Sequence, residues 1–153
     1  GTKWVKLNAF VLYSNLATTS LTVTTLETTL ATISIKGGVL GENGKLRFYI
    51  AGTVTNSANN KIFRLRHSSA IIWQLGLTTA VGVAAQVLFL NKNSESSQTN
   101  SLTNSHGLSG ASFTLVTTSS IDTSADFSLT FTGQLANSAD SMSVTTIFAE
   151  IMQ

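Results

Sequence analysis

Cysteine and proline are both absent from this sequence, and charged residues make up only 10% of it. Without cysteine, no disulfide can form and no thiolate can serve as a nucleophile or metal ligand. The formal net charge of +2 gives little electrostatic attraction to nucleic acid. Two histidines and seven acidic residues offer little material for a metal site. We therefore expect no cofactor and no nucleic-acid partner.

Long hydrophobic runs are also lacking. No stretch approaches the roughly 18 consecutive apolar residues of a membrane span, so we expect no membrane association. The first residues, Gly1 to Trp4, lack the apolar core of a signal peptide. A small first residue is typical of a chain that has lost its initiator Met. We therefore expect a complete gene product that is made in the host cytoplasm and not exported.

Hydroxyl and amide side chains take the place of the missing charges, alongside hydrophobic residues at 42%. This hydrophobic content is sufficient for a packed core, and 153 residues is the usual size of one domain. Threonine is β-branched and favours strands, whereas serine and asparagine favour turns. The composition therefore predicts strands joined by turns.

The clearest strand runs from 45 to 55. Four of its hydrophobic residues alternate with polar or small ones: Leu46, Phe48, Ile50 and Val54. An alternation with period two is typical of a strand that is buried on one face. Asn43-Gly44 before it supplies the backbone conformation of a tight turn.

Similar patterns predict the other strands, which lie near 21–23, 33–35, 61–67, 69–75, 80–90, 113–115, 127–131 and 142–151. The polar stretch from 91 to 110 is predicted to be one long exposed loop. About eight or nine strands with regular turn signals favour an all-β fold, a jelly-roll-like β-sandwich of two antiparallel sheets. Residues 17–153 are predicted to form this single domain.

A turn motif occurs twice. Gly52-Thr53-Val54-Thr55-Asn56-Ser57-Ala58-Asn59 resembles Gly133-Gln134-Leu135-Ala136-Asn137-Ser138-Ala139-Asp140, and each copy follows an alternating strand. Two similar Greek keys would produce such a repeat, as in a jelly roll. Chance convergence of turn composition is the alternative.

Residues with catalytic chemistry are few and scattered. His67 and His106 lack a neighbouring nucleophile motif, so both are interpreted as surface histidines. Asp122, Asp126 and Asp140 could gather at one end of the sandwich as calcium ligands, although turn formation is the simpler interpretation. The chain is therefore predicted not to be an enzyme.

The basic residues Lys61, Arg64 and Arg66, with Arg47 on a neighbouring strand, are predicted to form a cluster. Alternation places Arg64 and Arg66 on one face, where they could dock on an acidic surface. An ordinary solvated sheet face is the alternative.

The segment 1–16 is rich in large apolar side chains that do not alternate strictly. Trp4, Phe10 and Tyr13 are candidate docking residues if this segment is an arm that packs on a neighbour. The alternative is that it forms the first strand of the chain's own sandwich.

The chain resembles short tailed-phage virion proteins of jelly-roll type, either capsid cement (decoration) proteins or tail-fibre domains. The resemblance rests on Gly41-Glu42-Asn43-Gly44-Lys45-Leu46-Arg47, on the segment from Gly52 to Lys61, on Arg64-Leu65-Arg66, on Asp122-Thr123-Ser124-Ala125 and on Gly133-Gln134-Leu135-Ala136-Asn137. It covers most of residues 40–150. The resemblance implies no catalytic residues and a location in the virion.

Two functions follow from these observations. The first is a capsid cement protein that stabilises the phage head by binding the major capsid protein, or another virion protein, as a homodimer or homotrimer. The second is a receptor- or glycan-binding module of a tail fibre or tail tip. In that module Tyr49, Trp73 and the asparagine-rich segment 91–104 would contact sugar.

Overall fold

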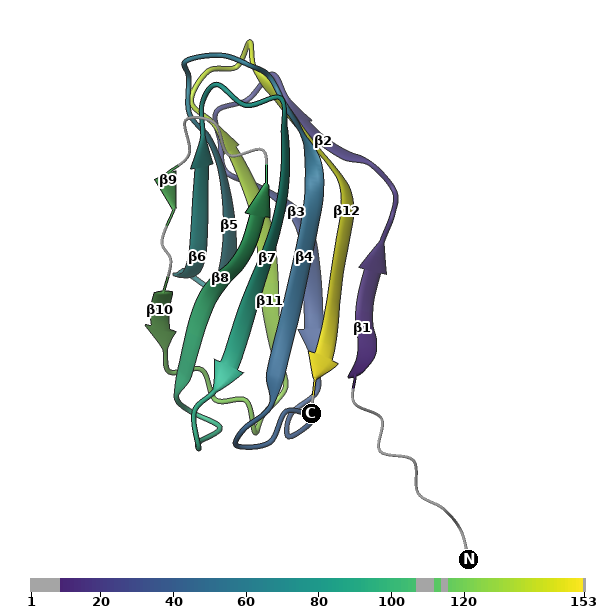
Figure 1. Cartoon of the computed structure of the whole chain (residues 1–153), viewed down its shortest axis with the longest axis vertical. Coiled ribbons are helices and arrows are strands. Elements are labelled where there is room, and N and C mark those ends of the chain that lie inside the picture. Colours follow the sequence, from purple (N-terminus) through teal and green to yellow (C-terminus); the bar gives the residue numbers. More distant parts are fainter. Residues whose placement is uncertain (1–8, 107–111, 114–115, 153) are drawn as a thin grey trace, which may run out of the picture.

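A computed structural model describes residues 9–106, 112–113 and 116–152. Within these ranges the chain contains strands and no helix, so the predicted all-β class is confirmed. Two antiparallel sheets face each other in a jelly-roll-like β-sandwich (Figure 1). No helix in the described ranges has the length and hydropathy needed to cross a membrane.

Sheet A, the front layer in Figure 1, has seven strands. Its strands follow the spatial order β1 (Ala9–Asn15), β12 (Ser141–Met152), β4 (Lys45–Val54), β7 (Gly82–Asn91), β8 (Gln98–His106) and β10 (Val116–Ser119). The seventh strand, β2 (Thr19–Thr22), pairs with the first part of β12, and β1 pairs with the rest. Thus β1 and β2 together line one edge of the sheet.

Sheet B, behind it, has five strands. Their order is β3 (Thr28–Ile35), β11 (Phe127–Leu135), β5 (Lys61–His67), β6 (Ala70–Leu77) and β9 (Ser112–Phe113). The described residues thus contain twelve strands where about eight or nine were predicted. The three strands missing from the predicted set are β1, which was one of two alternatives, and β8 and β10.

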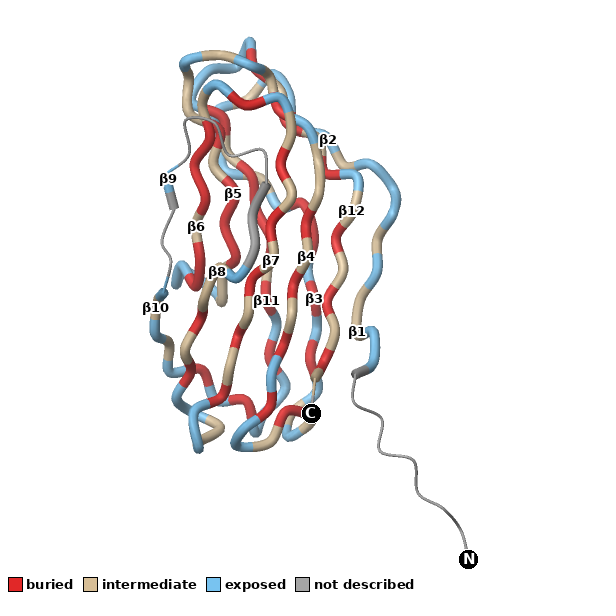
Figure 2. The backbone as a smooth tube through the Cα atoms, viewed as in Figure 1, coloured by how far each residue is buried: buried red, intermediate tan, exposed pale blue. Residues whose placement is uncertain are grey.

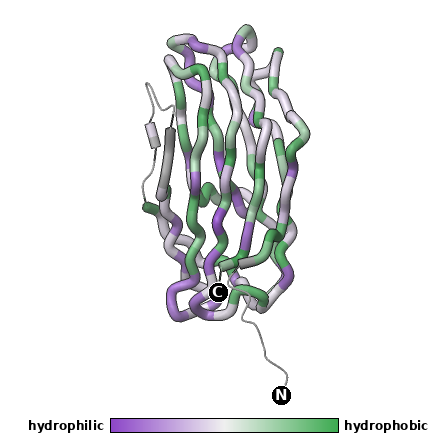
Figure 3. The backbone as a smooth tube through the Cα atoms, turned by 45° about the vertical axis from the view of Figure 1, so that its right-hand side comes forward, coloured by the Kyte–Doolittle hydropathy of each residue, from purple (hydrophilic) through white to green (hydrophobic). Residues whose placement is uncertain are grey.

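The hydrophobic core lies between the two sheets, and buried residues occur along the strands of both sheets (Figure 2). The alternation predicted for 45–55 is confirmed, because Leu46, Phe48 and Ile50 of β4 are all at most 3% exposed. Phe131 of β11 is 3% exposed, and Phe127 stacks on Phe89 of the opposite sheet with ring centroids 6.2 Å apart. Hydrophilic residues are concentrated in the loops at the two ends of the sandwich (Figure 3).

The two copies of the repeated turn motif lie side by side at one end of the sandwich. One joins β4 to β5 and the other joins β11 to β12, so each carries the chain from one sheet to the other. The Thr55 amide donates to the Ser141 carbonyl at 3.0 Å, and the Ser57 hydroxyl donates to Asp140 at 3.0 Å. A Cβ at Gly52 would lie 2.0 Å from the Ser143 carbonyl oxygen, which explains the glycine in the first copy.

The prediction that 91–110 is one exposed loop is wrong. Residues 98–106 form β8, which pairs with β7 and β10 inside sheet A. Gln98 and Asn100 are each 1% exposed, because their amides point inward. Only 92–97 connects β7 to β8 as a short loop. Residues 107–111 of the predicted loop lie outside the described ranges.

Candidate functional site

The predicted basic cluster is divided among three places. Arg47 lies on sheet A, where it forms an ion pair with Glu150, so it does not neighbour the arginines of β5. The Lys61 side chain is fully buried, and its amine donates to the carbonyl oxygens of Thr78 at 2.7 Å and Asn59 at 2.8 Å. Burial lowers the pKa of Lys61. Only Arg64 and Arg66 share the outer face of sheet B.

Glu27, which the sequence analysis did not single out, neutralises much of the charge of these two arginines. Arg66 donates to its carboxylate from Nε at 2.5 Å and from Nη2 at 2.8 Å, and Arg64 donates from Nη1 at 2.9 Å. The hydrogen bond from Arg66 lowers the pKa of Glu27 most, partial burial opposes this, and Thr132 and Arg64 add to the lowering. The cluster is therefore an internally paired network, in which one carboxylate is shared by two arginines and one net positive charge remains.

The three candidate docking residues of the N-terminal segment differ in their placement and exposure. Trp4 lies outside the described residues. Phe10 is 38% exposed on β1, whereas Tyr13 of the same strand is partly buried against the core. Because β1 pairs with β12 along its whole length, Phe10 and Tyr13 belong to an edge strand of sheet A.

The aromatic residues that were considered for sugar binding differ in accessibility. Trp73 is 1% exposed and points into the core, so it cannot stack on a sugar. Tyr49 lies on the outer face of sheet A, where its ring stacks on Phe148 with centroids 5.4 Å apart. In the asparagine-rich segment, the Asn91 and Asn100 side chains are buried and face loop and strand atoms.

The three aspartates do not gather. Asp140 lies in the turn that follows β11, whereas Asp122 and Asp126 lie in the loop that precedes β11, so they are at opposite ends of that strand. Among the described residues, no three His, Cys, Asp or Glu side chains are close enough to hold a metal ion. His67 Nδ1 lies 3.0 Å from the Ser128 carbonyl oxygen, and the His106 side chain is not described.

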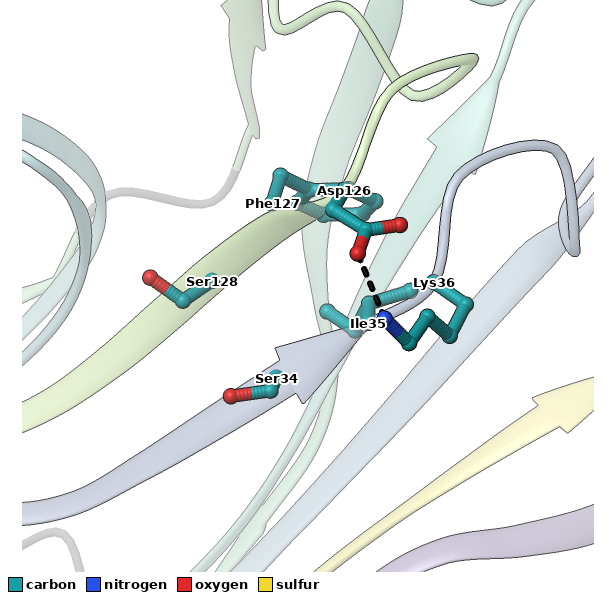
Figure 4. A pocket seen from close by; sticks show the side chains of 6 residues that line it. All are labelled: Ser34, Ile35, Lys36, Asp126, Phe127 and Ser128. Atoms are coloured by element: carbon teal, nitrogen blue, oxygen red, sulfur yellow. Dashed lines mark hydrogen bonds and ion pairs between the residues drawn. The ribbon is translucent and has the colours of Figure 1, made fainter.

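A shallow depression is present where β3 ends and β11 begins (Figure 4). It has a volume of about 380 Å³ and is lined by Ser34, Ile35, Lys36, Asp126, Phe127 and Ser128. Ser34 and Ser128 are cross-strand partners, and their hydroxyls point the same way in Figure 4. The depression therefore combines two exposed hydroxyls with the charged pair of Lys36 and Asp126.

The charged pair is held by the backbone of the adjoining loop. Asp126 accepts hydrogen bonds from the Gly37 amide at 2.9 Å and from the Lys36 amine at 2.6 Å. The Gly37 amide is the main cause of the lowered pKa of Asp126, so this carboxylate stays ionised at neutral pH. A Cβ at Gly37 would lie 2.3 Å from the Ser124 carbonyl oxygen, so only glycine allows the two loops to approach this closely.

A buried polar network fixes the loops that carry Lys36 and Asp126. Asn91 donates to the Gly41 carbonyl at 2.7 Å and to the Thr123 hydroxyl at 2.8 Å. The Gln98 amide side chain donates to the Ile121 carbonyl at 2.9 Å and accepts from the Ile121 amide at 2.8 Å. Because these bonds are buried, breaking them would leave polar groups buried without partners, which is costly in free energy. The network therefore holds the two loops, and with them the depression, in one shape.

The chemistry of the depression suits binding. Hydroxyls donate and accept hydrogen bonds, an ammonium only donates and a carboxylate only accepts, so the lining can match a ligand that carries several hydroxyls. Among the described residues that line it, Asp126 is the single carboxylate. Glycoside hydrolysis ordinarily requires two carboxylates across the bond that is cleaved, and the lining does not supply them.

Sequence reasoning did not find this depression. Lys36, Ser34 and Ser128 carry no motif, and Asp126 was interpreted as a residue that makes a turn. Hydrogen bonding of Asp126 to Gly37 agrees with that interpretation. The signal that was available is the pair of exposed polar positions in the alternating segments 33–35 and 127–131. Only the pairing of β3 with β11 brings those two positions together.

Comparisons with known proteins found no matching family model and no matching curated protein. Among solved structures, the CBM2 module of the evolved Dit of Lactobacillus casei BL23 phage J-1 has 14% identity and a TM-score of 0.45, covering 95% of this chain and 97% of that chain. Lectin II from Ulex europaeus has 12% identity and a TM-score of 0.42, covering 95% and 93%. None of these likenesses assigns a function to a residue of this chain.

Proposed function

We propose that the chain is a recognition module of a phage tail that binds carbohydrate in the depression between β3 and β11. The observation that carries this proposal is the combination of two hydroxyls and one ion pair on adjoining strand ends, Ser34, Ser128, Lys36 and Asp126. A pyranose presents hydroxyls that each donate and accept, so these groups replace the hydrogen bonds that the sugar loses from water.

The size and rigidity of the site fit this role. About 380 Å³ lies at the lower end of the volumes of small-molecule sites, which suits one or two sugar rings. Because the site is open, we expect it to bind a sugar weakly, with a dissociation constant of about 1 mM. Many copies on one particle would compensate, because linked sites convert weak single contacts into strong overall attachment.

The direct test is a titration of the whole chain with neutral sugars, monitored by NMR. Glucose, galactose, mannose, rhamnose and N-acetylglucosamine are each added up to about 50 mM, which exceeds the expected dissociation constant. Binding should shift the backbone signals of Ser34, Lys36 and Ser128. Shifts confined to other parts of the chain, or none with any sugar, would refute the proposed site.

A pair of substitutions tests whether the depression itself is responsible. Ser128→Leu fills the depression and removes one hydroxyl, so affinity should fall at least tenfold. Thr118→Leu makes a comparable change at an exposed position of β10, which belongs to sheet A and not to the sheet that carries the depression, and should leave affinity unchanged. Equal losses in both variants would show that the effect is not local.

A second candidate function is capsid cement, which the sequence analysis put first. The observation that favours it is the outer face of sheet A, where Tyr49 and Phe148 stack beside the Arg47–Glu150 pair. Aromatic residues and arginine are enriched in the centres of protein interfaces. In this role the chain would lie on the virion head and stabilise the shell.

Particles that lack the protein distinguish the two candidates. For a tail recognition module, they should withstand heat normally and fail to adsorb to host cells. For a cement protein, they should adsorb normally and rupture at a lower temperature, because bound subunits stabilise the shell by their binding free energy. Normal adsorption together with early rupture would therefore overturn the tail proposal.

A further inference from the structure

The outward side chains of the three central strands of sheet A form a surface that we call the sheet A face. Its members are Arg47, Tyr49 and Ala51 of β4, Ala84, Gln86, Leu88 and Leu90 of β7, and Phe148, Glu150 and Met152 of β12. All ten are partly exposed. Most are apolar, Arg47 and Glu150 pair with each other, and the exposed Lys45 of β4 lies at one end of the face between Leu90 and Met152. Such a surface, poor in charge and containing aromatic residues, Met and Arg, has the composition of an interface centre.

The register of the strands arranges this face symmetrically. On the neighbouring strands β4 and β12, Arg47 lies directly opposite Glu150 and Tyr49 directly opposite Phe148. The two rings stack at an interplanar angle of 30°. Along the boundary between the two strands, a cation therefore faces an anion and one aromatic ring faces another.

We propose that a second copy of the chain packs face to face on the sheet A face. The twofold axis would lie in the interface and run along the boundary between β4 and β12. A rotation by 180° about this axis brings β12 of the second copy over β4 of the first. Arg47 then meets Glu150 of the second copy, and Tyr49 meets Phe148. The face is thus complementary to itself, as a closed dimer requires.

The available area is sufficient for a modest dimer. The three strands of the sheet A face and their neighbours β1 and β8 are spaced about 4.8 Å apart and are about 30 Å long on average, so an interface that includes all five strands covers about 700 Å² before side-chain relief. A specific interface typically buries about 800 Å² on each partner. Val11 of β1, 63% exposed, extends the apolar surface toward the sheet edge.

The geometry of sheet packing agrees with this arrangement. Two sheets that pack face to face lie about 10 Å apart with their strands rotated by about 30°. This rotation is about the normal to the sheets, so it moves residues far from the crossing point of the two sheets most and residues near it least. With the crossing point between the Arg47–Glu150 and Tyr49–Phe148 pairs, these pairs are the part of the interface that is displaced least. The depression on sheet B stays open in this dimer.

The test uses exchanged charges and sedimentation velocity of the whole chain. At about 100 µM the unchanged chain should sediment as a dimer. Arg47→Glu and Glu150→Arg should each be monomeric, because each places like charges on both sides of the axis. Mixing the two variants in equal amounts should restore a dimer, because every contact across the axis then joins opposite charges.

The mixture separates an interface effect from a loss of internal stability. Each variant also loses its own ion pair, and mixing cannot restore a bond within one chain. Ala51→Arg, which leaves the ion pair intact and places a bulky charge on the face, should also be monomeric. Thr32→Glu, on the exposed side of β3 in sheet B, should remain dimeric.

Several results would overturn the proposal. They are a monomer for the unchanged chain at 100 µM, dimers that persist in Ala51→Arg, and a mixture that stays monomeric although both variants give the far-UV spectrum of the unchanged chain. Association that depends instead on residues 1–13 would point to the sheet edge and would equally exclude this face.

Discussion

The outer faces of the two sheets differ in the chemistry they present. Sheet A presents stacked rings and aliphatic side chains around one ion pair, Arg47–Glu150. Sheet B presents hydroxyls and amides, including the cross-strand pair Ser34 and Ser128, together with the network around Glu27. The first composition favours contact with another protein and the second favours contact with water or a hydroxylated ligand. Protein assembly and ligand recognition can therefore use opposite outer faces of one small sandwich.

The two sides of one strand provide the largest contrast. Phe48→Ala should lower the free energy of unfolding by about 3–5 kcal/mol, because it opens a cavity between the sheets. Tyr49→Ala, the next residue, should lower it by about 1 kcal/mol, since the ring lies on the outer face. Urea denaturation measures both, and similar values would show that the inner and outer sides of β4 are assigned wrongly.

Glu27→Gln tests the polar network that distinguishes the outer face of sheet B. Arg64, buried on that face, loses its charged partner, so the free energy of unfolding should fall by about 2 kcal/mol at neutral pH. Glu42→Gln, in an exposed loop, is the matched control and should change it little. A loss that disappears at high ionic strength would contradict the buried network, because salt screens exposed ion pairs much more than buried ones.

The same substitution has a signature in pH. The pKa of Glu27 is lower in the folded chain than its ordinary value, so the ionised network stabilises the fold above that ordinary value, about 4.3. This contribution is lost as the pH falls through the lowered pKa. The difference in stability between the unchanged chain and Glu27→Gln should therefore shrink as the pH is lowered from 6 toward 3. If this difference in stability grew as the pH was lowered, the pKa of Glu27 would be raised by folding and not lowered.

The segment between β2 and β3, which crosses from sheet A to sheet B, contains a strained residue. Val23 has a φ of 60°, a conformation that a β-branched residue rarely adopts, and its side chain is 82% exposed. Val23→Asn should raise the free energy of unfolding by about 0.5–1 kcal/mol, because Asn tolerates this conformation. Val81→Asn, exposed at 70% and without a positive φ, should bring no gain.

Asp126→Asn should produce the smallest change in stability and a clear change in binding. The Lys36–Asp126 pair is exposed to solvent, and exposed pairs stabilise folds little, so the midpoint of thermal unfolding should stay close to that of the unchanged chain. Sugar affinity in the NMR titration should nevertheless fall about tenfold, because a charged acceptor is lost. Unchanged affinity would remove Asp126 from the proposed site.

Strands with alternating hydrophobic residues were predictable, and those with inward polar residues were not. The burial of β4 follows its sequence residue by residue. In contrast, β8 reads as a polar loop because amides occupy inward positions where apolar residues are usual. The buried side chains of Gln98 in β8 and Asn91 in β7 form hydrogen bonds with each other and with the backbone of a loop. These partners are distant in the sequence, so no local pattern predicts them.

The repeated turn motif was informative about architecture. Its two copies predicted equivalent connections, and they prove to be neighbouring corners that carry the chain between the sheets. The candidate site was less accessible to sequence reasoning. Glu27 precedes its arginine partners by 37 and 39 positions, and Ser34 and Ser128 are further apart still. Neither spacing signals a contact.

Composition and alternation alone determined that this chain is a β-sandwich and which side of most strands is buried. These properties are local, because successive side chains of a strand point to opposite faces whatever its neighbours are. The order of the strands was decided only by the tertiary structure, since it depends on burying all the apolar sides at once. That order places Ser34 beside Ser128 and Glu27 beside two arginines, and within sheet A it places Arg47 beside Glu150.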